Sequence, residues 1–270
     1  GPFAPSGRDP GPPEPDGSGQ VKEFLEGKEQ PYYDPFRLKN MDRAVERILR
    51  ALQQGEPMTI YGDYDVDGTS ASSLLYLFLR RHGAQVDVYV PRRDREGYGL
   101  NVPALEKIAG RGTKLLITVD TGISGAQVVA QAPKDLDIII TDHHLAPREL
   151  PRALAVVNPN QPGDGYPFKG IAGVGVAFKL CQALEQKLTG NPDLFWDDLI
   201  ELGGPGHCGG HGALRDENRE IVRKGLAKMP HSPLLGLQAL IHVTAAPGAA
   251  INSAPSVSAW APDQRCRSAG

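Results

Sequence analysis

The chain has 270 residues, of which 40% are hydrophobic, enough for one well-packed core and a smaller appendage. Its 29 basic and 32 acidic residues give a net charge of −3, which excludes the overall basic character of a protein that coats DNA. Three cysteines without a C-x-x-C pair favour a reducing cytoplasm over a disulfide framework or zinc site, and no apolar run approaches the ~20 residues of a membrane span.

The first 20 residues consist almost entirely of glycine, proline, serine and acidic residues. This composition cannot bury enough surface to offset the entropy lost on ordering, so we expect residues 1–20 to be disordered. Apolar residues then recur at helical spacing from Met41 to Leu52. Asn40 is the predicted N-cap of this helix, and Gly55 is its predicted C-cap.

Short apolar runs alternate with helical patterns through the middle of the chain. The predicted strands are Met58–Tyr61, Val86–Val90, Leu115–Val119, Asp137–Thr141 and Leu154–Val157. The predicted helices between and after them are Thr69–Arg81, Val102–Ala109, Gly125–Ala132 and Gly175–Leu188. This alternation is typical of a parallel sheet with helices on both faces. We predict a doubly wound α/β fold over residues 21–200, and a divergent, partly helical remainder over residues 201–270.

Three aspartates at alternate positions, Asp63, Asp65 and Asp67, follow the first predicted strand. Clustered carboxylates repel one another and resist burial, so the arrangement favours a bound cation. The spacing resembles the first half of an EF-hand calcium loop, but Leu74 stands where that loop requires a bidentate glutamate. The other alternative is that these carboxylates only cap the helix that follows.

More acids and a histidine pair follow other predicted strands. Asp120 comes after the third strand, and Asp142, His143 and His144 come after the fourth. Open parallel sheets bind ligands at the carboxyl ends of their strands, so we expect these side chains to meet the first acid cluster. Carboxylates and imidazoles without thiolate suit Mn²⁺ or Mg²⁺. Two such ions bridged by a carboxylate would support hydrolysis of a phosphoester, with one histidine as a ligand and the other facing the substrate.

Two further segments leave alternatives open. Gly173 and Gly175 lie where a predicted helix begins, and the backbone N–H groups there could bind a phosphate. The same glycines could instead allow close helix packing. The three arginines within Arg92–Arg95, Arg93 among them, could form with Tyr98 a basic, stacking rim for single-stranded DNA, or only a solvated loop.

These motifs, in this order, resemble the DHH phosphoesterase superfamily and, within it, the RecJ-like nucleases. The resemblance runs from about Pro35 to Asn252. The matching motifs are Gly62–Gly68, Glu96–Asn101, Thr118–Gly122, Thr141–His144, Val157–Asn160, Gly173–Ala177 and Glu217–Arg219. The resemblance implies degradation of single-stranded DNA from the 5′ end, with Mn²⁺ or Mg²⁺, in DNA repair and recombination. It also implies a single-strand-binding protein and a helicase as partners.

The resemblance, together with the acid spacing, assigns roles to individual residues. The candidate metal ligands are Asp63, Asp65, Asp67, Asp120, Asp142 and His143. His144 is expected near the scissile phosphate, as a catalytic residue together with Asp142. The candidate substrate-binding residues are Gly173, Gly175, Arg93 and Asn101.

One family motif is missing. The family carries an aspartate in a Gly-Thr-x-Ala-Asp motif before the segment that begins here at Leu214, whereas residues 203–213 form a glycine- and histidine-rich stretch. A back-translation of this stretch, read one base later, gives Val-Ala-Leu-Gly-Thr-Val-Ala-Asp-Thr-Ala, which contains the motif. The end of the chain behaves in the same way. We therefore hypothesise that residues 203–213 and 253–270 are frameshift products, and we expect the family's second, nucleic-acid-binding domain to be absent.

Two other functions stay open at this point. One is a DHH phosphoesterase that acts on nanoRNA, cyclic dinucleotides or nucleotide bisphosphates, and the matches at residues 96–101 and 217–219 favour the RecJ-like function over it. The other is a catalytically inactive nucleic-acid-binding relative, against which the intact acid cluster and histidine pair argue. For the chain as written we expect a folded core from about Arg43 to Leu188, a poorly ordered remainder and low activity.

Overall fold

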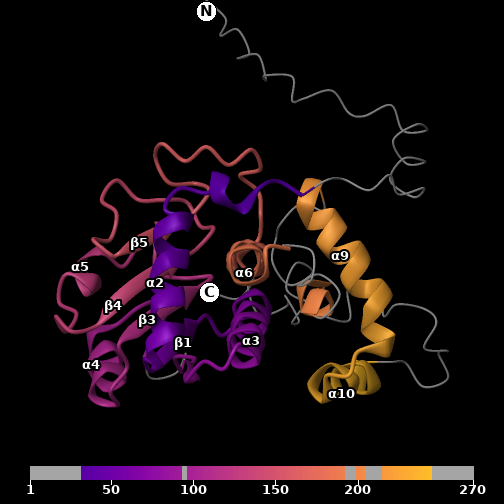
Figure 1. Ribbon diagram of the computed structural model, residues 1–270, viewed down its shortest axis with the longest axis horizontal. Coiled ribbons are helices and arrows are strands. Elements are labelled where there is room, and N and C mark those ends of the chain that lie inside the picture. Colours follow the sequence, from indigo (N-terminus) through magenta and orange to yellow (C-terminus); the bar gives the residue numbers. More distant parts are fainter. Residues whose placement is uncertain (1–31, 93–95, 192–198, 205–214, 245–270) are drawn as a thin grey trace, which may run out of the picture. The chain divides into compact units, whose positions relative to one another are not determined.

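A five-stranded parallel sheet organises the computed structural model, which describes residues 32–92, 96–191, 199–204 and 215–244 (Figure 1). These residues all belong to one structural unit, which begins at Tyr32. The predictions for residues 1–20 and for Arg93 lie outside the described residues, as do nearly all of the 203–213 stretch and the whole of residues 253–270.

The strands follow the order β2-β1-β3-β4-β5, and each neighbouring pair is parallel. Their bounds are Met58–Gly62 for β1, Val86–Tyr89 for β2, Leu115–Val119 for β3, Asp137–Thr141 for β4 and Ala155–Val157 for β5. In the register, Ile60 pairs with Ile117, which in turn pairs with Ile139. The doubly wound parallel sheet that the sequence predicted is therefore confirmed.

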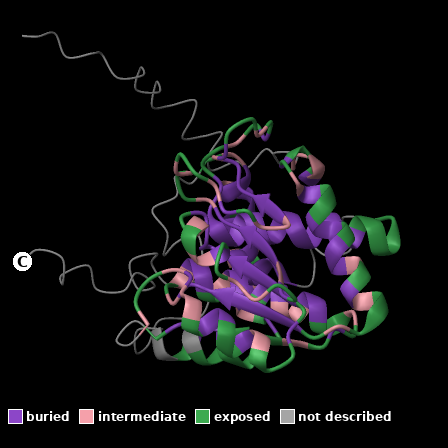
Figure 2. Cartoon of the chain, turned by 90° about the vertical axis from the view of Figure 1, so that its left-hand side faces the viewer, coloured by how far each residue is buried: buried purple, intermediate pink, exposed green. Residues whose placement is uncertain are grey.

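Helices cover both faces of the sheet. Helices α2 (Met41–Gln54), α3 (Val66–Arg81) and α6 (Gly173–Thr189) pack on one face, over strand residues that include Ile60 and Ile117. Helices α4 (Val102–Gly110) and α5 (Ala126–Val129) pack on the other. Strands β1 and β3 are buried along their whole length, because side chains on both faces are covered by helices. Figure 2 shows the buried interior of the sheet in purple.

Several element boundaries differ from the sequence predictions, and side-chain capping explains the largest differences. Helix α3 begins at Val66 instead of Thr69 because the Asp65 carboxylate accepts the Gly68 N–H at 2.9 Å and caps it. Asn40 occupies the N-cap position of α2, but its side chain donates to the Val156 carbonyl and makes no cap bond. Gly55, with φ of 65°, ends α2 as predicted.

Further helices follow α6 in the described part of the chain. The other elements of the described residues are the 3₁₀ turns η1 (Pro35–Arg37), η2 (Ile200–Leu202) and η3 (Met229–His231) and the helices α9 (Asp216–Lys228) and α10 (Leu235–Thr244). Our expectation that order ends near Leu188 is wrong for residues 216–244, because Ile221 and other α9 side chains are buried against the rest of the unit. No helix among the described residues is long and apolar enough to cross a membrane.

Candidate metal centre

The acids and histidines predicted from the sequence meet at the carboxyl edge of the sheet. Asp63 follows β1, Asp120 follows β3, and Asp142 begins the turn after β4. The chain runs from β1 outward to β2 and then returns to place β3 on the opposite side of β1. This reversal is the topological switch point, where open α/β sheets bind their ligands.

Two aspartates of the first cluster, Asp63 and Asp65, differ in burial and in their hydrogen bonds. Asp63 is 5% exposed and accepts the Tyr64 N–H at 2.6 Å. Burial is the main cause that raises the pKa of Asp63, and the negative charge of Asp65 adds to it. Asp65 is exposed while it caps α3, so helix capping and metal binding are not exclusive for this residue.

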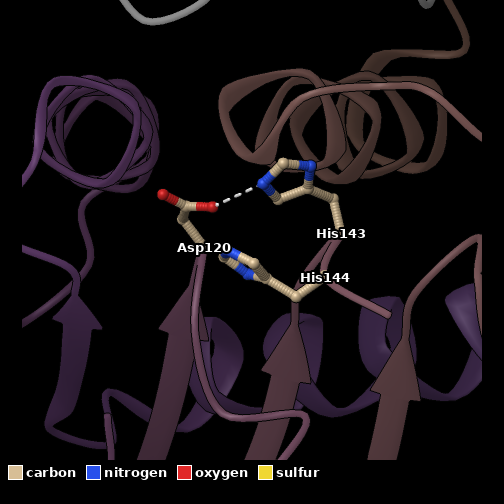
Figure 3. A group of neighbouring side chains, drawn as sticks. All are labelled: Asp120, His143 and His144. Carbon is tan, nitrogen blue, oxygen red and sulfur yellow. Dashed lines mark ion pairs between the residues drawn. The ribbon is translucent and has the colours of Figure 1, made fainter. Parts of the chain in front are cut away.

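Asp120 lies at the centre of the site. It is 1% exposed, and its Oδ1 atom has no hydrogen-bond partner within the described part of the chain. Figure 3 shows its carboxylate facing His143, whose Nε2 lies 3.1 Å from Oδ1. Burial, followed by the charge of Asp67, raises the pKa of Asp120 well above the ordinary range of a carboxyl. A buried carboxylate with an unsatisfied oxygen has the chemistry of a metal ligand.

Two groups of potential ligand atoms share Asp120. In one, atoms of Asp63, Asp65 and Asp120 lie within 4.8 Å of one another, and in the other, atoms of Asp120, His143 and His144 do. The donor set of both groups fits divalent cations, and Asp63, Asp65, Asp120, His143 and His144 are the residues that would hold them.

Asp142 organises the turn that carries the histidines. Its Oδ1 accepts hydrogen bonds from the His143 N–H at 2.7 Å, the His144 N–H at 3.1 Å and the His144 Nδ1 at 2.7 Å, and its Oδ2 accepts the Ile123 N–H at 2.9 Å. Burial alone would raise the pKa of Asp142, but the bonds from His144 and the backbone outweigh it and lower that pKa. The same side-chain bond raises the pKa of His144. Only Oδ2 of Asp142 retains capacity for a metal.

The N-terminus of α6 binds a carboxylate of the protein itself. The Gly173 N–H donates to Asp67 Oδ2 at 2.9 Å, and the Val174 N–H donates to Asp67 Oδ1 at 2.6 Å. A Cβ added at Gly173 would lie 2.2 Å from Asp120 Oδ1. The close neighbour of Gly173 is thus the Asp120 carboxylate, the anion at the helix end is Asp67, and a role for Gly173 and Gly175 in substrate binding stays a prediction. Gly175 is buried within α6.

Asn101 occupies a structural position. Its Oδ1 accepts the Ala104 N–H at 2.9 Å and caps α4, and its Nδ2 donates to the Tyr61 hydroxyl at 3.3 Å. A role for Asn101 in substrate binding stays a prediction. Nearby, Tyr98 is 57% exposed, and partial burial, followed by the charges of Asp63 and Asp142, raises its pKa.

Two asparagines without a predicted role support the histidine turn. Asn158 Nδ2 donates to the His144 carbonyl at 3.0 Å, and Asn160 Nδ2 donates to the His143 carbonyl at 2.6 Å. Their signal in the sequence was the Asn-Pro-Asn motif directly after the last predicted strand. These bonds clamp the backbone of both histidines to the end of β5.

Comparison with known proteins identifies the family of the chain. The family model described as the DHH family, N-terminal domain, matches residues 57–202, which is more than half of the chain. The chain is 45% identical to the single-stranded-DNA-specific exonuclease RecJ of Bacillus subtilis over 222 residues, or 82% of this chain and 27% of that protein. It is 34% identical to the enzyme of the same name from Escherichia coli, over 77% of this chain and 38% of that protein. The chain thus spans less than two fifths of the length of these relatives.

Solved structures agree with this placement. A structure of exonuclease RecJ bound to manganese superposes with a TM-score of 0.71 at 31% identity, covering 82% of this chain and 56% of the other. RecJ from Thermus thermophilus in complex with Mn²⁺ superposes with a TM-score of 0.66 at 30% identity, covering 82% of this chain and 31% of the other. The shared fold and the match over more than half of its length show that this chain belongs to the DHH family, among the relatives of RecJ.

Proposed function

We propose that this chain is the DHH domain of a metal-dependent exonuclease that hydrolyses single-stranded DNA from the 5′ end, in DNA repair and recombination. The observation that carries the proposal is the pair of ligand groups that share the buried Asp120. The relatives named single-stranded-DNA-specific exonuclease RecJ support the proposed substrate. The solved RecJ structures with Mn²⁺ or Mg²⁺ support the proposed metals. Cleavage of one phosphodiester bond by water is the reaction of this site.

The residues would share the work as follows. Asp63, Asp65 and Asp120 would hold one Mn²⁺ or Mg²⁺ ion, and Asp120 and His143 would hold a second. Asp67 would lie beside this second ion, because its Oδ2 is 3.8 Å from His143 Nε2. The ions supply Lewis-acid polarisation of the phosphate and activation of water. His144, with its Nδ1 bonded to Asp142 and its ring 46% exposed, is oriented to donate a proton or hydrogen bond through Nε2 to the phosphate or the leaving oxygen.

The polarity of cleavage tests the proposed substrate. A single-stranded oligonucleotide labelled at either end should lose nucleotides from its 5′ end in the presence of Mn²⁺, and a blunt duplex should stay intact. Raising the salt concentration should weaken binding, because phosphate contacts release counterions. A dinucleotide, a cyclic dinucleotide and a nucleotide bisphosphate form the control set. Faster turnover of these short substrates than of the long strand would assign the chain to the other branch of DHH phosphoesterases.

Metal binding should tighten as pH rises. Burial raises the pKa of Asp120 to about 10, so at neutral pH the metal-free site holds a proton on Asp120 that a cation must displace, and burial also raises the pKa of Asp63. Between pH 6 and pH 8 we expect the Kd for Mn²⁺ to fall by up to about tenfold per pH unit for each proton released. Isothermal titration calorimetry in buffers of different ionisation enthalpy counts these protons. An unchanged Kd without proton release would contradict the placement of these acids in the site.

The same acids set the stability of the metal-free protein. A carboxyl whose pKa is raised on folding holds its proton in the folded state and loses it in the unfolded state. The free energy of unfolding therefore falls as pH rises from about 4, the ordinary pKa of aspartate, towards the raised pKa of Asp120. Saturating Mn²⁺ should reverse this loss above neutral pH.

The proposal includes partners and location. A single-strand-binding protein and a helicase would deliver the DNA substrate, and these partners follow from the family resemblance. A cytoplasmic location is supported by Cys181, a buried free thiol in α6.

A further inference from the structure

The Asn218 side chain connects helix α9 to the turn that precedes α6. Asn218 is fully buried and bridges α9 to the segment just before α6. Its Oδ1 accepts the Ala172 N–H at 3.3 Å, and its Nδ2 donates to the Gly170 carbonyl at 2.8 Å. A single amide thus binds both an acceptor and a donor of the same short turn, which fixes the turn in position and in rotation.

The turn that Asn218 holds is continuous with the donors that bind Asp67. Ala172 is the N-cap of α6, and the next two N–H groups, of Gly173 and Val174, point at the two oxygens of Asp67. Asp67 is 2% exposed, and its Oδ2 lies 3.8 Å from His143 Nε2. A shift of the α6 N-terminus would therefore move the Asp67 carboxylate relative to His143.

Helix α9 is itself firmly anchored. Glu217, the neighbour of Asn218, is buried and accepts hydrogen bonds from Lys179 Nζ at 2.8 Å, from the Tyr33 N–H at 3.0 Å and from the Tyr166 hydroxyl. Lys179 is fully buried on α6, so this ion pair joins the two helices in one register. Asn218 is thereby presented to the turn by a rigid support.

We propose that Asn218 is a positioning residue for the metal centre, which acts by holding the Gly170–Ala172 turn so that the Gly173 and Val174 N–H groups fix Asp67. The inference rests on the proposed role of Asp67 beside the cations. Residues that orient metal ligands typically contribute 10–100-fold to affinity. This role also explains why the Glu-Asn-Arg motif lies far from the histidine pair in sequence and yet supports the same site.

Two variants of Asn218 distinguish the effect of its hydrogen bonds from the effect of its side-chain volume. Asn218→Ala removes both bonds and leaves a space, whereas Asn218→Leu removes both bonds and fills it. Tyr33→Phe is the control, because it removes the hydroxyl bond to Asp216 at 3.0 Å on the same end of α9 and leaves the turn untouched. All three proteins are full-length chains, compared by thermal unfolding, by amide hydrogen exchange without metal and by calorimetric titration with Mn²⁺.

Both Asn218 variants should exchange the Gly173 and Val174 amides about tenfold faster than wild type and bind Mn²⁺ about tenfold more weakly. Tyr33→Phe should lose stability without either change. Exchange and Mn²⁺ affinity equal to wild type in both Asn218 variants would overturn the inference, and so would an effect confined to Asn218→Ala. If wild type binds Mn²⁺ but does not cleave single-stranded DNA, the proposed function fails while these measurements still decide the role of Asn218. A wild type that does not bind Mn²⁺ would itself overturn the link to a metal centre.

Discussion

Replacement of Asp120 by asparagine should lower Mn²⁺-dependent hydrolysis of single-stranded DNA by more than about 100-fold. Loss of a residue that only orients a metal ligand typically costs 10–100-fold, so the loss of a ligand shared by two cations should cost more. Asp120 belongs to both groups of potential ligands and is 1% exposed, and its Oδ1 lacks a hydrogen-bond partner among the described residues. A time course of oligonucleotide shortening measures the effect.

The same variant should stabilise the metal-free protein. Burial and the charge of Asp67 raise the pKa of Asp120, which means that its charged form is unfavourable in the folded state at neutral pH. Asparagine keeps the shape and removes the charge, so the melting temperature in the presence of a chelator should rise at pH 8 and change less at pH 5.

The exposed Asp135 provides the matched control for Asp120, because Asp135→Asn removes one negative charge at a position outside the acid and histidine clusters. Both its activity and its melting temperature should equal those of wild type. If Asp120→Asn cleaved DNA as fast as the Asp135 control, Asp120 could not be a metal ligand.

Restoring the missing family motif should raise activity by at least about tenfold. The variant replaces Gly203–Ala213 with Val-Ala-Leu-Gly-Thr-Val-Ala-Asp-Thr-Ala-Pro, and so returns one aspartate to a site that must hold two divalent cations. The assay is hydrolysis of a short single strand under Mn²⁺, together with titration of Mn²⁺ binding. The matched control carries asparagine at the restored aspartate of the same inserted sequence, so that only the carboxylate differs.

The repaired chain must also repack locally. A Cβ added at Gly203 would lie 2.3 Å from Ile221 Cγ2, so the valine placed there requires the Ile221 side chain to move. Thermal unfolding of both inserted sequences shows whether the fold accepts them. If the aspartate and asparagine versions bound Mn²⁺ and cleaved DNA equally well, the missing carboxylate would not be the defect. Sequencing of the source DNA decides the frameshift hypothesis independently, since an in-frame sequence that encodes the present chain would reject it.

Much of the site followed from local sequence, because each acid lies directly after an apolar run. Five such runs alternating with helical patterns indicated a parallel sheet, and parallel strands bring their carboxyl ends to one edge. Asp63, Asp120 and the Asp142 turn therefore had to meet once the strand order was β2-β1-β3-β4-β5. The strand order itself, and with it the switch point between β1 and β3, required the structure.

Capping was only partly visible in the sequence. Asp65 was weighed either as a helix cap or as part of a metal cluster, and the structure shows that it caps α3 while it lies close to the other candidate ligands, Asp63 and Asp120. The start of α3 was misplaced by three residues for that reason. Local propensity cannot resolve such a case, because the same carboxylate satisfies both patterns until its neighbours are placed.

Tertiary structure alone decided what the α6 N-terminus binds and what holds it. Gly173 could equally have faced a phosphate or packed closely, and the answer depends on Asp67, which lies 106 residues earlier in the chain. Asn218 lies a further 46 residues beyond Ala172, and nothing within α9 indicates that its amide faces that turn. The sequence by itself determined the ligand types and the sheet edge at which they gather, because these depend on strand periodicity and direction. Only the tertiary structure revealed the hydrogen bonds that hold the candidate ligands in place, because each of these bonds joins segments that are brought together by the packing of whole helices.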